Sequence, residues 1–218
     1  MRRVPVRALY HVTPLHYVPH LLATGVLLSQ AELKRQCLPI VPRKTVARRD
    51  RKLGLDDFVH LSPTPVTPLL RDKFRRGFPH ALITFSPETL QLSAAALLRY
   101  NPKAFRHRED FRPITDPEEK SEVWADWERG AYPSLEIVIG KELPLVPLAR
   151  SLSLAEEWQE EWLRGFCRRR HLVLPVPIGG EAISWPPMSA CDRTVYRGYD
   201  EACEAAGLLL PPPLLTFD

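Results

Sequence analysis

A single glutamate interrupts a run of apolar residues between positions 132 and 140, which reads YPSLEIVIG. The aliphatic and β-branched residues of this run are typical of a buried strand. Side chains alternate between the two faces of a strand, so Glu136 and Val138 share one face. A carboxylate in such surroundings is costly unless it is paired or lines a cavity. Glu136 is therefore either part of a solvated edge strand or a catalytic carboxylate.

Two further strand-like stretches carry side chains that could bind a substrate. ALYHVT contains His11 and Thr13, and DDFVHLSP contains His60 and Ser62. Histidine can donate, accept or transfer a proton near neutral pH, which suits it to a binding or catalytic site. The alternative for His11 is a structural role, as a core histidine on a buried strand.

Positive charge is concentrated in the first quarter of the chain. Up to Leu55 there are eleven Lys and Arg residues and two acidic residues, a charge of +9, whereas the whole chain carries +4 and the remainder therefore −5. This asymmetry suggests an anionic partner such as nucleic acid or a dinucleotide, or else a solvated surface. The densest part, ARRDRK, contains Arg48, Arg49 and Arg51.

The segment VWADWERGAYP, directly before the glutamate strand, combines aromatic and charged residues. We expect it to be a loop, following a polar loop at 101–121. Aromatic rings next to arginine suit an unpaired nucleic-acid base, which stacks on them. The alternative is that the aromatic rings anchor the loop to the core. The residues concerned are Trp124, Trp127, Arg129 and Tyr132.

Periodicity and capping signals locate the elements that must position these residues. Thr13 and Gly25 delimit the first expected helix, which Pro19 should kink or shorten. Thr67 caps the second, which Gly77 ends. The expected order is a strand at 8–13, a helix at 13–25, a strand at 56–63, a helix at 67–77, a strand at 81–85, a turn or helix at 86–101, a strand at 135–139, a helix at 153–171 and a strand at 171–178.

The bulk composition limits the class of protein. The 218 residues, 44% hydrophobic and 26% charged, suit one globular domain with a C-terminal extension. No apolar run is long enough to span a bilayer, and no apolar signal core follows the basic start, so we expect a cytoplasmic protein with no membrane partner. The four cysteines form no C-x-x-C pair, which disfavours zinc and a disulfide framework, so no metal is expected.

Short strands with interposed helices predict an α+β fold. Several nucleotide-binding and hydrolase classes are disfavoured, because the sequence has no G-x-G-x-x-G after a strand, no Walker loop and no G-x-S-x-G elbow.

The order and separation of four segments resemble the DarT family, bacterial toxins that ADP-ribosylate bases in DNA. ALYHVTPLHYVPHLLATGVLLS resembles its Y-H-I-T strand and following helix, and ARRDRK its arginine-rich segment. LDDFVHLSPTPVTPLL is similar to its H-D-Y-V-P stretch, and SLEIVIGKELPL to the strand with the catalytic glutamate. The resemblance implies an ADP-ribosyltransferase-like fold, a split antiparallel sheet with flanking helices. We place this domain at 1–178 and a Pro-rich extension at 179–218.

The resemblance also implies roles for individual residues. Glu136 and Arg49 correspond to the catalytic pair, with Arg48 and Arg51 as alternative positions for the arginine. Residues implied to bind NAD are His11, Thr13, Phe58, His60 and Ser62. Residues implied to bind nucleic acid are Arg48, Arg51, Trp124, Trp127, Arg129 and Tyr132.

NAD cleavage explains why a glutamate would stand in an apolar strand. The bond between nicotinamide and ribose breaks through an oxocarbenium-like transition state, which a nearby carboxylate stabilises. The same carboxylate can accept a proton from the attacking nucleophile. The resemblance implies NAD as a substrate, single-stranded DNA in preference to RNA as the acceptor, and a toxin–antitoxin system with a macrodomain-type antitoxin.

Three other functions are compatible with the sequence. RNA 2′-phosphotransferases share the fold, and DDFVHLSP also resembles their H-V-H-L-S strand. These enzymes rely on a histidine and several arginines, and they do not need a glutamate on a late strand. A protein-modifying ADP-ribosyltransferase and a non-catalytic relative that binds nucleic acid are the other two.

Overall fold

The structure is a computed structural model that describes residues 7–36, 51–100, 112–180 and 183–191, together with 193, 196, 198 and 201. Its strands form three small antiparallel sheets. The first has the order β1 (Leu9–Pro14), β4 (His80–Phe85), β8 (Ala149–Ser153). The second has the order β3 (Val59–Leu61), β6 (Glu136–Ile139), β5 (Ala95–Leu98). The third pairs β2 (Val26–Leu28) with β7 (Glu142–Pro144).

Among the described residues, one β-bridge joins the two three-stranded sheets. The backbones of Tyr10 in β1 and Ser62 after β3 exchange two hydrogen bonds of 2.8 Å each. The prediction of an α+β fold with a split antiparallel sheet and flanking helices is confirmed.

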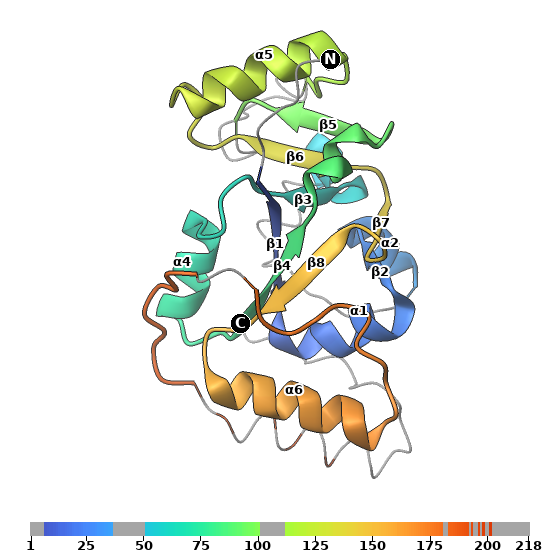
Figure 1. Cartoon of the computed structure of the whole chain (residues 1–218), viewed down its shortest axis with the longest axis vertical. Coiled ribbons are helices and arrows are strands. Elements are labelled where there is room, and N and C mark those ends of the chain that lie inside the picture. Colours follow the sequence, from blue (N-terminus) through green and yellow to red (C-terminus); the bar gives the residue numbers. More distant parts are fainter. Residues whose placement is uncertain are drawn as a thin grey trace.

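The helices lie around these sheets. Figure 1 shows α5 at one end of the long axis, beyond β5 and β6, and α6 at the other end, beyond α1. The helical elements are η1 (Leu15–Tyr17), α1 (Val18–Thr24), α2 (Gln30–Arg35), η2 (Leu55–Asp57), α4 (Pro68–Arg75), η3 (Pro87–Gln91), α5 (Pro117–Glu128) and α6 (Glu157–Arg169).

Capping residues act at two helices as the sequence predicts. The Thr67 side chain accepts a hydrogen bond from the backbone N–H of Leu70 at the start of α4. Gly25, with a φ of 68°, ends α1 in the left-handed conformation that favours glycine. Pro19 lies in the first turn of α1, so the expected helix is shortened and begins only after a 3₁₀ turn.

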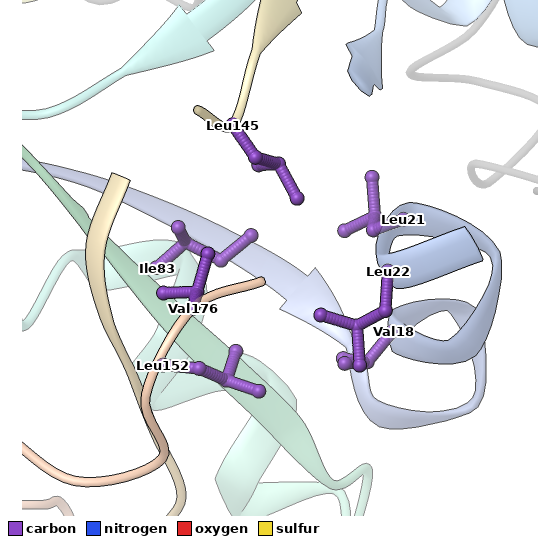
Figure 2. Close-up of a pocket in the computed structure, with 7 residues that line it drawn as sticks. All are labelled: Val18, Leu21, Leu22, Ile83, Leu145, Leu152 and Val176. Atoms are coloured by element: carbon purple, nitrogen blue, oxygen red, sulfur yellow. The ribbon is translucent and has the colours of Figure 1, made fainter. Parts of the chain in front are cut away.

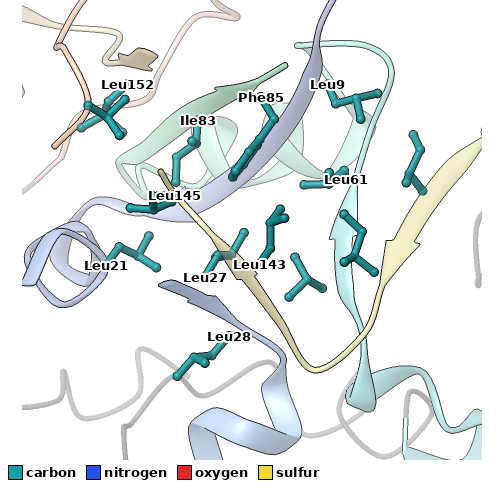
Figure 3. Close-up of a cluster of buried hydrophobic side chains, with 14 of the residues drawn as sticks. Leu9, Leu21, Leu27, Leu28, Leu61, Ile83, Phe85, Leu143, Leu145 and Leu152 are labelled. Carbon is teal, nitrogen blue, oxygen red and sulfur yellow. The ribbon is translucent and has the colours of Figure 1, made fainter. Parts of the chain in front are cut away.

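The main hydrophobic core lies between the sheets and α1. All six residues of β4 are buried, because this strand is paired on both sides and covered on both faces. Figure 3 shows the leucines of β1, β2, β3, α1 and β7 converging with Ile83 and Phe85 of β4. This core fixes the inner faces of both three-stranded sheets.

Three segments differ from the sequence prediction. The expected turn or helix at 86–101 contains β5, because pairing with β6 overrides the helix propensity of its alanines and leucines. The expected loop before Glu136 contains α5, which begins at the N-cap Asp116 followed by Pro117. The expected strand at 171–178 makes one bridge, from Ile178 to Leu152, since its prolines cannot donate to a ladder.

After α6 the chain returns across the outer face of the first sheet. Ile183 and Trp185 pack on a small apolar cluster that includes Tyr10 and Leu82. The Trp185 ring also stacks on Phe74 of α4, with 5.6 Å between ring centroids. This segment therefore seals the face of the sheet that points away from the main core.

No helix within the described part of the chain has the length and apolar character that crossing a bilayer would need.

Candidate functional site

Glu136 is the first residue of β6 and lies on the outer face of the second sheet. The register places His60 opposite Val138 and Leu98 opposite Glu136. His60 and Glu136 are therefore diagonal neighbours on adjacent strands, close enough for long side chains to meet. The apolar residues of this face, Ala96, Leu98 and Val138, form a cluster with Leu53 and Leu55 that is separate from the main core.

The His60 imidazole touches oxygen atoms through both of its ring nitrogens. Nδ1 lies 3.1 Å from Oε2 of Glu136, and Nε2 lies 3.0 Å from the backbone oxygen of Leu55. The side chains of His60 and Glu136 are 32% and 19% exposed, so solvent still reaches the pair. Pairing with His60 explains how a carboxylate is accommodated in an otherwise apolar strand.

His11 lies directly beside this pair, on β1. Its Nδ1 is 2.8 Å from the carbonyl oxygen of His60, which can only accept, so Nδ1 carries the hydrogen. Burial lowers the pKa of His11 to about 4; the hydrogen bond to the His60 carbonyl opposes this shift, and the nearby His60 side chain adds to it. His11 is thus neutral near pH 7, and its Nε2 is a hydrogen-bond acceptor.

The other residues expected at the NAD site lie around these two histidines. Thr13 is buried on the same face of β1 as His11 and is 2% exposed. Phe58 is partly buried against the cluster below His60. Ser62 is held by its backbone pairing with Tyr10, and its hydroxyl is 3.1 Å from that of Thr64. The fold thus brings His11, His60 and Ser62 together where β1 meets β3.

The arginine-rich segment is described only in part. Arg48 and Arg49 lie outside the described residues. Arg51 is 69% exposed, and its Nε lies 3.9 Å from Oδ2 of Asp56. Asp56 is also 3.5 Å from Nζ of Lys34 in α2, so two cations surround this carboxylate, next to the Leu55 carbonyl that contacts His60.

The aromatic residues before Glu136 divide into buried and surface groups. Trp124 is 2% exposed and packs on Trp127 at 5.0 Å, and its Nε1 donates to Glu128. In this position Trp124 anchors α5 to the core, and a base could stack on it only after its displacement. Arg129, exposed at the end of α5, pairs with Asp126.

Tyr132 is partly buried and packs against the main core. It makes an edge contact with Tyr100 at 5.8 Å, and the Arg99 guanidinium lies 6.0 Å from its ring centroid. Arg99 and Tyr100 directly follow Leu98, which is paired with Glu136. Neither residue stands out in the sequence, and only a correct prediction of β5 would have placed them at the strand end that pairs with the start of β6.

A cavity lies elsewhere in the molecule, between α1, β4 and β8. Figure 2 shows that every labelled side chain that lines this cavity is aliphatic: Val18, Leu21, Leu22, Ile83, Leu145, Leu152 and Val176. A dinucleotide needs donors and charges for its phosphates and hydroxyls, which these side chains cannot supply. This cavity is therefore a feature of the hydrophobic core.

No protein-family model matches the chain, and no curated protein matches it. Solved structures do match. DarT of Thermus sp. 2.9 in complex with ADP-ribosylated ssDNA has a TM-score of 0.59 at 16% identity, over 80% of this chain and 94% of its own. The same protein in complex with NAD+ has a TM-score of 0.53 at 16% identity, over 80% of this chain and 96% of its own.

Thermosipho africanus DarTG in complex with ADP-ribose is a third match, with a TM-score of 0.58 at 15% identity. The match covers 79% of this chain and 49% of the DarTG chain, so this chain spans about half the length of DarTG. The DarT-like ADP-ribosyltransferase fold that the sequence segments imply is confirmed by these structures.

Proposed function

We propose that this protein is an NAD-dependent ADP-ribosyltransferase that transfers ADP-ribose to a base of single-stranded nucleic acid. The observation that carries the proposal is the Glu136 carboxylate, held by His60 on the outer face of the second sheet and next to the neutral His11. The similarity to DarT structures with NAD+ and with ADP-ribosylated ssDNA supports this choice among the functions of such a fold.

The proposed reaction breaks the bond between the nicotinamide nitrogen and C1′ of the ribose. The bonding electron pair leaves with nicotinamide, and positive charge develops on the ribose, where the Glu136 carboxylate stabilises it. A nucleophilic atom of the acceptor then bonds to C1′. Glu136 accepts the proton that this nucleophile loses, which completes the transfer.

The remaining residues take the roles that the sequence resemblance implies. Nε2 of His11 would accept a hydrogen bond from a ribose hydroxyl, and Thr13 would assist. Phe58 would stack on nicotinamide, with His60 and Ser62 lining the same pocket. Arg49 would contact the pyrophosphate or orient the target base, since a planar guanidinium suits either, and Arg48 and Arg51 remain alternatives for this role.

We place the acceptor over the surface that precedes Glu136. Tyr132, Tyr100 and Arg99 meet there, and an unpaired base can stack on such a group. Trp127 and Arg129 extend this surface along α5. A base inside a duplex is stacked and out of reach, so single strands are the expected substrate, DNA in preference to RNA.

The biological setting follows from the same proposal. An enzyme that modifies DNA bases damages its host, so the protein would act in the cytoplasm as the toxin of a toxin–antitoxin system. A macrodomain-type antitoxin that removes ADP-ribose would be its partner. Expression without a growth defect in a bacterial host would count against this role.

Incubation with NAD labelled in its adenylate phosphate tests the function. Wild-type protein is incubated separately with single-stranded DNA, single-stranded RNA and a bacterial protein extract. Glu136→Gln serves as the inactive control. Glu142→Gln, which changes an exposed glutamate of β7, serves as the matched control. We expect the label to enter single-stranded DNA with wild type and Glu142→Gln only.

The other outcomes each overturn part of the proposal. If the label enters RNA alone, the acceptor is RNA and not DNA. If the label enters protein alone, the proposal of a nucleic-acid acceptor is wrong. Binding of oligonucleotides with no NAD cleavage by wild-type protein would make this chain a non-catalytic binder.

A further inference from the structure

The contacts of His60 determine how many protons it shares with Glu136. The Leu55 carbonyl cannot donate, so Nε2 of His60 carries a hydrogen. The contact between Nδ1 and Oε2 of Glu136 at 3.1 Å needs one more hydrogen, because two lone pairs would repel each other. The pair therefore holds this extra proton and has no net charge while the contact exists.

The extra proton belongs on the imidazole. An unperturbed imidazole is a stronger base than a carboxylate by about two pK units, and attraction between the resulting ions favours the same arrangement. Both side chains retain some exposure to solvent. In this form His60 is an imidazolium and Glu136 is the anion that the proposed reaction requires.

The charged groups on neighbouring elements have partners of their own and do not compete with Glu136 for His60. His11 on β1 is neutral near pH 7, since burial lowers its pKa to about 4. On η2, Asp56 is paired with Lys34 and Arg51, while Asp57 is 3.7 Å from Arg35. Beyond β5, Arg99 is paired with Glu119 at 3.0 Å, next to Tyr132. Glu136 is thus the carboxylate that His60 contacts directly.

We infer that His60 is a positioning residue for Glu136, which it holds in place as an anion only while His60 itself is protonated. This inference rests on the proposed function, and it adds a role to the expected place of His60 in the NAD pocket. When the pH rises through the titration of His60, Nδ1 loses its hydrogen and the contact with Oε2 becomes repulsive. NAD cleavage should then decline on the alkaline side as Glu136 is released.

The first test requires no enzymatic activity. Histidine resonances of the full chain are followed by NMR against pH in wild type and in Glu136→Gln, and the His60 resonance is assigned by its loss in His60→Asn. We expect the midpoint of His60 to move to lower pH in Glu136→Gln, because the carboxylate that favours the imidazolium is gone. His171, exposed after α6, serves as the reference and should not move.

The second test compares pH profiles of NAD hydrolysis. Asparagine places a non-titrating N–H donor near the position of Nδ1, so His60→Asn should retain more activity than His60→Ala and should lose the alkaline decline. At pH values below the titration of His60, His60→Ala should lower kcat about 10-fold or more, the scale of one charge-assisted hydrogen bond, with a smaller change in KM. On the alkaline side its kcat should approach that of wild type.

The two tests separate this inference from the proposed function. An unchanged His60 midpoint in Glu136→Gln overturns the inference, whether or not the protein cleaves NAD. So does an alkaline decline that persists in His60→Asn, or a wild-type kcat in His60→Ala at pH values where His60 is protonated. If wild-type protein cleaves no NAD but the His60 midpoint moves as expected, the pair exists and the proposed function fails.

Discussion

The outer faces of the two three-stranded sheets are used in opposite ways. On the first sheet, Ile183 and Trp185 cover an apolar face, and His80 at the start of β4 is buried there with 6% exposure. On the second sheet, His60 and Glu136 stay partly exposed above a small apolar cluster. Both sheets turn their inner faces to one core, so the difference lies in what covers the outer face.

The two histidines show what this difference means for charge. Burial lowers the pKa of His80 to about 4, so it is neutral in the folded protein near pH 7. His60 faces a carboxylate and contacts oxygen through both nitrogens, which favours its charged form. A sealed face thus holds a histidine that contributes to packing, whereas an accessible face holds one that can serve chemistry.

Removing the charge of Glu136 should give the largest effect. Glu136→Gln is expected to lower the rate of NAD cleavage about 10²-fold or more, the scale of a lost electrostatic group in a transition state. Turnover is measured by nicotinamide release, with Glu142→Gln as the control. A folded Glu136→Gln protein with near wild-type turnover would show that the accessible face is no more catalytic than the sealed one.

Acid should act through the buried histidines, which include His80 on the sealed face and His11 next to the candidate site. The unfolded chain protonates its histidines near pH 6.5, whereas native His80 does so only near pH 4 and native His16 near pH 3, both mainly through burial. Unfolding therefore takes up protons in this window, and the free energy of unfolding falls as the pH drops from about 6.5 to 4. For His80 alone the loss reaches about 3 kcal/mol.

Urea denaturation at several pH values checks this loss. His80→Gln should show a shallower decline between pH 6.5 and 4 than wild type. Equal slopes for His80→Gln and wild type would contradict the assignment of His80 as a buried neutral histidine.

Removing the Trp185 ring, which covers the outer face of the first sheet, should lower the free energy of unfolding by an intermediate amount. Trp185→Ala removes the ring that stacks on Phe74 and is expected to lower the free energy of unfolding by about 2 kcal/mol, less than for a fully buried tryptophan. Leu69→Ala, at a site that is 50% exposed, should change it by less than about 0.5 kcal/mol. Denaturation midpoints for the two variants compare them, and similar midpoints would show that the segment around Trp185 does not seal the sheet.

The smallest effects concern exposed arginines at the two ends of the molecule. Arg129 on α5 and Arg164 on α6 each pair with an acid of their own helix, so replacing either with alanine should change stability by less than about 0.5 kcal/mol. Arg129→Ala alone should weaken oligonucleotide binding and reduce its salt dependence, as loss of about one phosphate contact would. Oligonucleotide titrations at several salt concentrations measure the dependence of affinity on salt. If the two variants show the same dependence, Arg129 does not contact the acceptor.

Local patterns were sufficient to predict much of the fold. Thr67, Pro68 and Gly77 delimit α4, and the apolar run at β4 predicts a strand, because caps and side-chain patterns act over a few residues. Segments whose local preference was overridden were predicted incorrectly. β5, with helix-forming alanines and leucines, is a strand only because β6 pairs with it.

For the candidate site, the sequence by itself determined that a glutamate stands on an apolar strand and that histidines stand on two others. The alternation of side chains along a strand is a local property, so it assigns Glu136 to a face without knowledge of its neighbours. Which residue meets Glu136 was decided only by the tertiary structure. His60 reaches it because β3 and β6 pair in one particular register, 76 residues apart in sequence, and a shift of one residue would turn His60 to the other face.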